Sequence, residues 1–223
     1  MTDIEQGSEA WRHLRLGKVT ASRVADVIAK TRTGWGASRA NYMAELLVER
    51  LTGQAQEGYM NAAMQWGIDT EPQARAAYEL MQDCDVLAAG FVPHPSIDMA
   101  GASPDGFVGD DGLVEFKCPM TATHIETLLG DSIPGKYIGQ MQFQMACTGR
   151  KWCDWVSFDP RLPAAMQLFV KRVNRDDEAI ERLEMLIGEF LFELDNKIAA
   201  LDRRYSPGRY GAPREAVNIL QAG

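Results

Sequence analysis

The stretch Ser103-Pro104-Asp105-Gly106, followed by Leu113-Val114-Glu115-Phe116-Lys117, decides the fold expected for this chain. Between the two parts lies Gly109-Asp110-Asp111-Gly112, which is typical of a hairpin turn. Side chains alternate faces along a strand, so Glu115 and Lys117 point to one side while the apolar residues beside them point into a core. The stretch therefore predicts two paired strands that present charged side chains on one face.

The length of the turn decides whether Asp105 and Glu115 share a face of the sheet. A two-residue loop at 110–111 would pair Asp105 with Phe116 and would place the two acids on opposite faces. A shared site needs a loop with an odd number of residues, a bulge, or an Asp105 that lies in a turn before the strand. We expect the last arrangement, because Ser-Pro-Asp-Gly has the composition of a turn.

These residue types suit a divalent metal ion. Mg²⁺ prefers oxygen ligands, and a few protein ligands hold it while water and substrate phosphate complete the octahedron. Asp105 and Glu115 would supply anionic oxygens, and the backbone carbonyl of Phe116 would add a neutral one. Lys117 would orient an attacking water or stabilise charge on a phosphate. The motif alone is weak, because a turn aspartate beside an exposed ion pair on a strand edge gives the same pattern.

Further blocks occur in order along the chain, at Trp11 to Gly17, Thr20 to Ser22, Val27 to Lys30, Trp66-Gly67 with Glu71, Gln140 to Phe143 and Asp159 to Arg161. Together with the hairpin stretch, they resemble the phage lambda exonuclease type of the YqaJ-like viral recombinase and alkaline exonuclease family, a branch of the PD-(D/E)xK nuclease superfamily. The resemblance implies an α/β fold with a restriction-endonuclease-like core, in which α-helices flank a mixed central β-sheet.

The resemblance also implies an activity. The protein would be a Mg²⁺-dependent, processive 5′→3′ exonuclease, with Mn²⁺ as a substitute metal, that digests one strand from double-stranded DNA ends. The 3′ overhangs would serve phage-type homologous recombination with a single-strand annealing recombinase. A homotrimer ring in the bacterial cytoplasm, encoded by a phage or prophage, is expected. Two alternatives stay open: an endonuclease or junction-cleaving enzyme with the same site, and a catalytically inactive DNA-end-binding protein.

The resemblance assigns supporting catalytic roles to two further residues. Glu71 corresponds to an acid on a helix near the metal, although an acid in the first turn of a helix needs no metal to explain it. Gln140 corresponds to a glutamine near the active site, where its amide can hydrogen-bond a water or a phosphate oxygen. Gln140 and Gln144 fall on one face of a predicted helix, and a solvated polar face is the alternative.

A second group of residues corresponds to the family's DNA-end contacts. Arg15, Ser22 and Arg32 match a pocket for the DNA 5′-phosphate, which guanidinium groups bind with two hydrogen bonds. Ser22 also suits a plain helix cap. Met64 matches an apolar side chain that wedges into the duplex end, although a methionine here is commonly core.

Charge is distributed unevenly along the chain. The net charge of −8 argues against a protein that simply coats DNA, because affinity for duplex comes mostly from neutralising phosphates. Between Arg12 and Arg39, however, lie seven Lys or Arg and a single acid, Asp26. A confined basic surface on an acidic body suits an enzyme that holds DNA in a channel. A solvated helix face is the competing interpretation.

The composition predicts one domain. We expect a single nuclease domain over residues 1–202 and a polar tail over 203–223, because no Pro/Gly/Ser-rich linker divides the chain. The four cysteines form no CxxC pair, which disfavours zinc and disulfides. No apolar run approaches the ~20 residues that a membrane helix needs, so no membrane association is expected.

The residue pattern predicts the following elements. Helices are expected over 8–16, from 20 or 22 to 30, over 39–51, from 61 to 67, from 69 or 70 onward, over 136–147 and over 177–201. Strands are expected over 86–92, 97–102, 152–158 and 168–173, besides the hairpin. Residues 31–38 are expected to form a loop.

Overall fold

Two sheets form the framework of the computed structural model, which describes residues 6–55 and 61–205. The larger sheet has the strand order β10-β9-β8-β7-β4, with bounds Leu168–Asn174, Trp152–Phe158, Gly112–Lys117, Gly106–Val108 and Val86–Leu87. β8 and β9 run parallel, while the other neighbouring strands run antiparallel, so this sheet is mixed. The smaller sheet has the order β1-β6-β5, with bounds Val19–Thr20, Ala100–Ala102 and Val92–Pro93.

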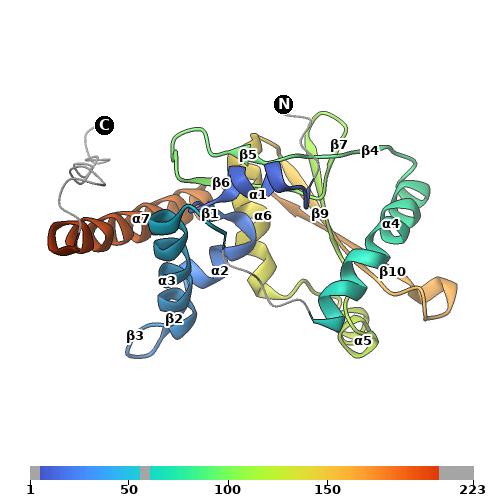
Figure 1. The fold of residues 1–223 in the computed structure, drawn as a ribbon. Helices are drawn as coiled ribbons and strands as arrows, with labels where there is room; N and C mark the ends of the chain where they lie inside the picture. Colours follow the sequence, from blue (N-terminus) through green and yellow to red (C-terminus); the bar gives the residue numbers. More distant parts are fainter. Residues whose placement is uncertain (1–5, 56–60, 206–223) are drawn as a thin grey trace.

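Helices surround this framework (Figure 1). Their bounds are Glu9–Arg15 for α1, Val24–Val27 for α2, Ala37–Thr52 for α3, Ala62–Gln82 for α4, Thr121–Gly130 for α5, Gly135–Thr148 for α6 and Asp177–Tyr205 for α7. Short 3₁₀ turns η1 and η2 cover Ala21–Arg23 and Ala164–Met166, and a hairpin joins β2 (Lys30–Thr31) to β3 (Gly34–Trp35). The expected α/β class, a mixed sheet flanked by helices, is confirmed.

The alternation of side chains along β8 divides the core between the two faces of the larger sheet. Val114 and Phe116 pack with Ala74 and Tyr78 of α4 on one face. Leu113 packs on the other face in a cluster that includes residues of α6. Glu115 has the same parity as Leu113, so its carboxylate lies between the sheet and α6.

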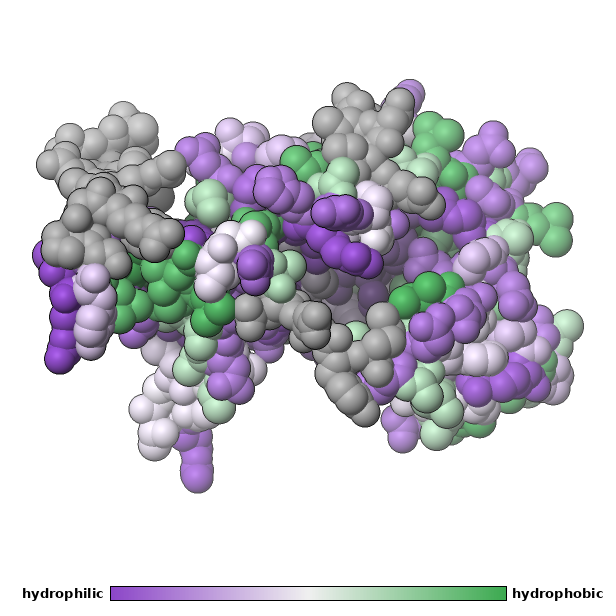
Figure 2. Space-filling model, viewed as in Figure 1, coloured by the Kyte–Doolittle hydropathy of each residue, from purple (hydrophilic) through white to green (hydrophobic). Residues whose placement is uncertain are grey.

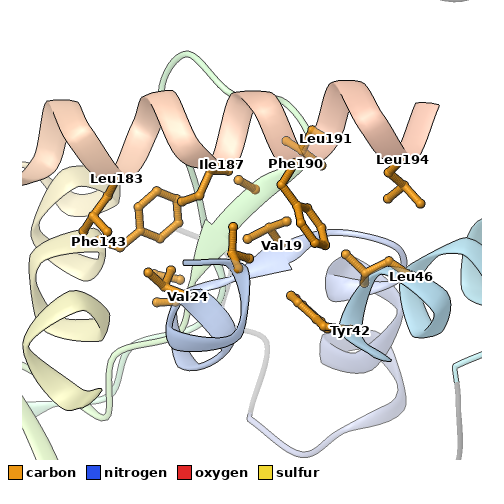
Figure 3. Close-up of a cluster of buried hydrophobic side chains, with 14 of the residues drawn as sticks. Val19, Val24, Tyr42, Leu46, Phe143, Leu183, Ile187, Phe190, Leu191 and Leu194 are labelled. Carbon is orange, nitrogen blue, oxygen red and sulfur yellow. The ribbon is translucent and has the colours of Figure 1, made fainter. Parts of the chain in front are cut away.

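A third cluster lies beside the sheet, where α7 crosses α2, α3 and α6 (Figure 3). Ile187 and Phe190 of α7 are fully buried there, and Phe190 stacks on Tyr42 of α3. The apolar residues that recur every three or four positions along α7 therefore form core within a single chain. Within the described residues, no helix is long and apolar enough to cross a membrane.

Several predicted elements differ from the structure. The helix expected to run to residue 30 is the short η1–α2 segment, and neither of its caps makes a side-chain hydrogen bond. The loop expected over 31–38 contains the β2–β3 hairpin. The strands expected over 86–92 and 97–102 are shorter, and they belong to different sheets. Helix α5 was not predicted; it is held by buried His124, which contacts Ser157 and the carbonyl of Met166.

The two helices expected on either side of residue 68 form one helix, α4, capped by Asn61. Pro72 lies inside this helix, where packing of Thr70, Ala74 and Tyr78 outweighs the loss of one backbone hydrogen bond. At the other end, α7 continues to Tyr205, so residues 203–205 are helical and not part of a tail. The rest of the predicted tail, residues 206–223, lies outside the described residues.

Candidate active site

The β7–β8 hairpin brings Asp105 and Glu115 to the same face. Its register pairs Gly106 with Val114 and Val108 with Gly112, which leaves a three-residue loop at 109–111. The two-residue loop considered at 110–111 is therefore wrong. Continuing the register by one residue places Asp105 opposite Glu115. Asp105 lies in a bend directly before β7, as predicted from the turn composition.

Glu115 is held by three donors. Glu115 is only 1% exposed. Its Oε1 accepts hydrogen bonds from both Lys117 and Gln140, the latter at 2.6 Å. Oε2 accepts from Gln144 at 2.6 Å. A buried carboxylate is stable only when its lone pairs find donors, and here two amides and an ammonium supply them. The ion pair is therefore buried between the sheet and α6, and not exposed on a strand edge.

Lys117 remains charged in this setting. Burial would lower the pKa of Lys117, but the negative charges of Glu115 and Asp105 outweigh it and raise the pKa above its usual value. The ammonium also lies 5.3 Å from the centre of the Tyr137 ring on α6. About a quarter of the side chain stays accessible, at 28% exposure, so the cation can reach a group that enters from solvent.

Two hydrogen bonds fix Asp105, one to its side chain and one to its backbone carbonyl. Its Oδ2 accepts from the backbone N–H of Phe116 at 2.7 Å, and its carbonyl accepts from Arg75 of α4 at 2.6 Å. Burial, followed by the charge of Glu115, raises the pKa of Asp105 well above its usual value. The next residue, Gly106, has to be a glycine, because a Cβ at this position would lie only 2.1 Å from the Val86 side chain.

Glu71 projects toward the same cluster from the middle of α4. The alternative of an acid in the first turn of a helix is wrong, since α4 begins nine residues earlier, at Ala62. Burial raises the pKa of Glu71, with Arg75 opposing this effect and the charge of Glu115 adding to it. Glu71, Asp105, Glu115 and Lys117 are thus one electrostatic cluster, with three acids and a single lysine.

The excess of acid is what a divalent cation would compensate. Among the described residues, no group of three or more His, Cys, Asp or Glu side chains is arranged to hold a metal ion. Asp105 and Glu115, with the carbonyl of Phe116, remain the donor set, which suits Mg²⁺ because it keeps several water ligands. Burial is the first cause of the raised pKa values of Asp105 and Glu71, and the charge of Glu115 adds to both, a repulsion that a bound cation would offset. The residues present therefore fit a hard cation.

A pocket lies at the C-terminal end of α1. Arg15 and Ser22 both line it, as do three further cations: Arg12, Lys18 and Arg23. Arg23 is paired with Asp26 and Glu45, whereas Arg15 donates to the hydroxyl of Ser103 and stacks on the Trp11 ring. Two acids, Glu45 and Glu49, also line the pocket, and the charge of Glu49 acts on Arg15. Figure 2 shows a hollow near the middle of this face, with hydrophilic side chains around it.

Two residues predicted to contact the DNA end, Arg32 and Met64, do not line this pocket. Arg32 is exposed in the turn of the β2–β3 hairpin and does not line the pocket with Arg15 and Ser22. Met64 is 50% exposed in the first turn of α4, so the alternative of a core methionine is wrong. The basic segment is partly neutralised, because Arg39 is buried and pairs with Glu193 of α7.

Sequence reasoning missed several contacts of the site. From the sequence alone, Gln144 was noted only for sharing a helix face with Gln140. That spacing of one turn was the signal that Gln144 could contact the same group as Gln140, the carboxylate of Glu115. Arg75 also lies one turn after Glu71, which places both on the same side of α4. Ser103 belongs to the turn motif, but nothing in the sequence showed its two partners, Trp11 and Arg15.

Comparisons with known proteins agree with this geometry. The model of the YqaJ-like viral recombinase domain matches residues 10–151. The crystal structure of an alkaline exonuclease (LHK-Exo) from Laribacter hongkongensis is 53% identical, with a TM-score of 0.83, and the match covers 88% of this chain and 97% of that chain. The structure of LHK-Exo in complex with dAMP matches over the same shares with a TM-score of 0.84.

A more distant structure shares the fold. A phage related exonuclease from Haemophilus somnus 129PT is 15% identical, with a TM-score of 0.69, and the match covers 85% of this chain and 99% of that chain. A comparison with curated protein sequences returned no match.

Proposed function

The chain belongs to the YqaJ-like viral recombinase family, and we propose on this basis that it is an exonuclease acting on double-stranded DNA. Its fold is the restriction-endonuclease-like nuclease fold expected from the resemblance. The observation that carries the proposal is the convergence of Asp105, Glu115 and Lys117 in one buried cluster, supported by Gln140. The alkaline exonuclease LHK-Exo, which is 53% identical, supports the same reaction class.

The residues of the cluster would divide the work of phosphodiester hydrolysis. Asp105, Glu115 and the carbonyl of Phe116 would hold Mg²⁺, with Mn²⁺ as a substitute, and the ion would lower the pKa of a bound water and neutralise phosphate charge. Lys117 would orient the attacking water or stabilise charge that develops on the phosphate. Gln140 fixes the carboxylate of Glu115, so its role is positioning. Glu71 would support the cluster from α4.

The 5′→3′ direction of digestion would come from the pocket lined by Arg15 and Ser22. A terminal 5′-phosphate carries more negative charge than an internal diester, so a desolvated arginine that lines the pocket favours the DNA end. Arg15 lines the pocket, and burial lowers its pKa although the charges of Tyr42 and Glu49 oppose this effect, which indicates a desolvated cation. Digestion would therefore begin at 5′ ends and leave 3′ single strands for recombination.

Four elements of the proposal come from the resemblance. Arg32 would reach the 5′-phosphate from the β2–β3 turn, and Met64 would wedge into the duplex end. The homotrimer ring would give processivity, because a ring around DNA retains an acidic protein without high affinity. The single-strand annealing recombinase would take up the 3′ overhangs in the bacterial cytoplasm.

The test is a timed digestion of linear duplex labelled separately at its 5′ and 3′ termini, with Mg²⁺ and with EDTA. The proposal predicts early release of the 5′ label, late release of the 3′ label, and no release in EDTA. Covalently closed circular duplex serves as the second substrate and should stay intact. Early release of the 3′ label would contradict the polarity, and cutting of the circle would favour the endonuclease alternative.

A further inference from the structure

The aromatic ring of Tyr137 lies beside the ammonium of Lys117. Tyr137 is in the first turn of α6, three residues before Gln140 and seven before Gln144. Residues at these spacings share one side of a helix, so Tyr137 continues the row of α6 side chains that contact Glu115. The Lys117 Nζ atom lies 5.3 Å from the centre of the ring, which is within the range of a cation–π contact.

The sheet fixes this ring in place. Tyr137 packs on Trp155 of β9, with the ring centres 5.7 Å apart, and Trp155 is fully buried. Trp155 is paired with Glu115 in the parallel β8–β9 ladder, so both side chains lie on the same face of the sheet. Tyr137 is half-buried, and its hydroxyl makes no hydrogen bond with any described residue. Packing on Trp155, and not a side-chain hydrogen bond, therefore positions the ring.

The ion pair of Lys117 shares its acceptor with another group. Oε1 of Glu115 accepts from Lys117 and also from Gln140. As a metal ligand, the same carboxylate would face a divalent ion as well, and two cations on one carboxylate repel each other. A bound metal ion would therefore weaken the attraction between Glu115 and the ammonium of Lys117.

A neutral ring attracts the ammonium without this competition. The face of an aromatic ring is negative, and it attracts a cation most strongly where water is excluded. Lys117 is largely shielded from water, whereas Lys136, which lies 4.8 Å from the same ring centre, is exposed. Mg²⁺ prefers oxygen ligands, so it would not displace Lys117 from the ring. The contact with Tyr137 would therefore persist when Glu115 holds a metal ion.

We propose that Tyr137 is a positioning residue whose ring keeps the Lys117 ammonium in the cluster when Glu115 binds the metal ion. This inference rests on the proposed function, and it adds a residue outside the predicted site. The ring supplies no metal ligand, so its loss would leave the ligand set intact. Without the ring, the flexible four-carbon stem of Lys117 would let the ammonium move into solvent, where it cannot act on the phosphate.

The direct test is the proton chemical shift of the Lys117 ε-methylene group, measured by NMR in protein with isotope-labelled lysine. The shift is recorded in EDTA and in saturating Mg²⁺, and Lys117→Met identifies the signal by removing it. Protons above an aromatic ring move upfield, so the inference predicts an upfield signal in both conditions. The signal should return to the ordinary lysine position in Tyr137→Leu. A wild-type signal at the ordinary position in Mg²⁺ would overturn the inference.

Digestion of linear duplex in Mg²⁺ measures the consequence for activity. Tyr137→Leu lowers kcat by about 10-fold, the size of a largely shielded cation–π contact, with little change in KM. Tyr137→Phe keeps the ring and the wild-type kcat. In the Lys117→Met background, Tyr137→Leu causes no further loss, because the ring then has no ammonium to hold.

Phe169→Leu is the matched control. Phe169 of β10 packs on the same Trp155 ring at 6.1 Å, and within the described part of the chain it makes no contact with a cation. Its replacement removes a ring from the same cluster and should leave kcat unchanged. Circular dichroism and thermal melting show whether each variant folds. If Tyr137→Leu does not fold, the wild-type signal in Mg²⁺ decides.

The remaining outcomes separate the inference from the proposed function. Equal losses of kcat in Tyr137→Leu and Phe169→Leu, or a further loss in the Lys117→Met background, would assign the effect to packing and overturn the positioning role. A loss in Tyr137→Phe as large as in Tyr137→Leu would assign it to the hydroxyl, with the same consequence. A wild-type protein without Mg²⁺-dependent digestion would overturn the proposed function, and the role of Tyr137 with it.

Discussion

Gln144 donates a hydrogen bond of 2.6 Å to Oε2 of Glu115, and this bond joins the middle of α6 to the central strand of the larger sheet. Gln140, one turn earlier, donates to Oε1 at the same distance. Both amides and the carboxylate are buried, so water does not replace either donor. The two glutamines therefore set the orientation of the acid that the site depends on.

Replacing Gln144 with methionine keeps its volume and removes the donor to Oε2. We expect a loss of about 1–3 kcal/mol of unfolding free energy, because a buried charged acceptor is left unsatisfied. We also expect the digestion rate of the folded variant to fall by about 10- to 100-fold, because a misplaced ligand weakens the metal site. Urea unfolding and Mg²⁺-dependent digestion measure the two effects.

Gln142→Met is the matched control for this variant. Gln142 lies on the same helix and is also buried, but its amide contacts the backbone of Asn174 and Asp176. The same loss of about 1–3 kcal/mol is expected, since two backbone groups lose their partner, with no selective loss of digestion. Equal kinetic losses in both variants would show that Gln144 acts only through stability.

Asp105→Asn removes one charge and keeps an acceptor for the N–H of Phe116. Without metal, the variant should be at least as stable as the parent, because it relieves repulsion from Glu115 and Glu71. With Mg²⁺ at 100 times its Kd, the parent should gain about 2.7 kcal/mol and the variant much less. Digestion should fall by about 100-fold or more. Equal Mg²⁺ stabilisation of both proteins would refute Asp105 as a ligand.

Glu115→Ala should destabilise the protein more than the loss of a surface carboxylate would, because Glu115 is buried. The structure buries Glu115 among Gln140, Gln144 and Lys117, so removing it leaves two buried amides and a partly buried ammonium without their acceptor. We expect loss of digestion together with about 3–5 kcal/mol of stability. Chemical unfolding in EDTA measures that loss, and a variant as stable as the parent would contradict the buried ion pair.

Arg15→Ala should selectively impair duplex that bears a 5′-phosphate, by about 10-fold or more, since a charge-assisted contact is lost. Rates on 5′-hydroxyl ends should change little. Arg182→Ala removes the same charge from the exposed face of α7 and controls for the change in net charge. Equal losses on both kinds of end would show that Arg15 serves general backbone contact or structure.

Asp159 makes the stability depend on pH. Burial alone would raise the pKa of Asp159, but hydrogen bonds from Arg161 and Thr121 outweigh it and hold the pKa at about 2. A carboxyl with a lowered folded pKa adds stability above its unfolded pKa of about 3.9 and loses it as the pH falls toward 2.

We therefore expect Asp159→Asn to cost about 2 kcal/mol at pH 7, with the difference shrinking below pH 4. Urea unfolding of both proteins between pH 7 and pH 3 measures this difference. A difference that stays constant over this range would mean that the loss comes from geometry and not from the charge of Asp159.

Local chemistry was enough to predict the parts of the fold that depend on neighbouring residues. The hairpin followed from its glycines and aspartates, and β9 has the predicted bounds, Trp152–Phe158, because aromatic residues and a valine, which favour strands, recur through it. The helix expected over 177–201 corresponds to α7, because its apolar residues recur every three or four positions. Placing Asp105 in a bend needed only the turn composition of its own segment.

Elements that depend on distant contacts could not be predicted. Nothing local shows that α4 continues through Gly67 and Pro72, because the packing of Tyr78 against Phe116 and of Trp66 against Arg161 holds it. Helix α5 is rich in β-branched threonine, which lowers helix propensity, and it forms around the buried His124. The donors to Ser103 and to Oε2 of Glu115 likewise come from segments distant in sequence.

The central claim is that the ammonium of Lys117 acts beside a divalent ion held by Asp105 and Glu115. Lys117→Met keeps the aliphatic stem and leaves both amides on Glu115, so the variant should fold. The most direct measurement is its initial rate of Mg²⁺-dependent digestion of linear duplex, relative to the parent. The account predicts a loss of about 100-fold or more, and a rate equal to that of the parent would contradict it.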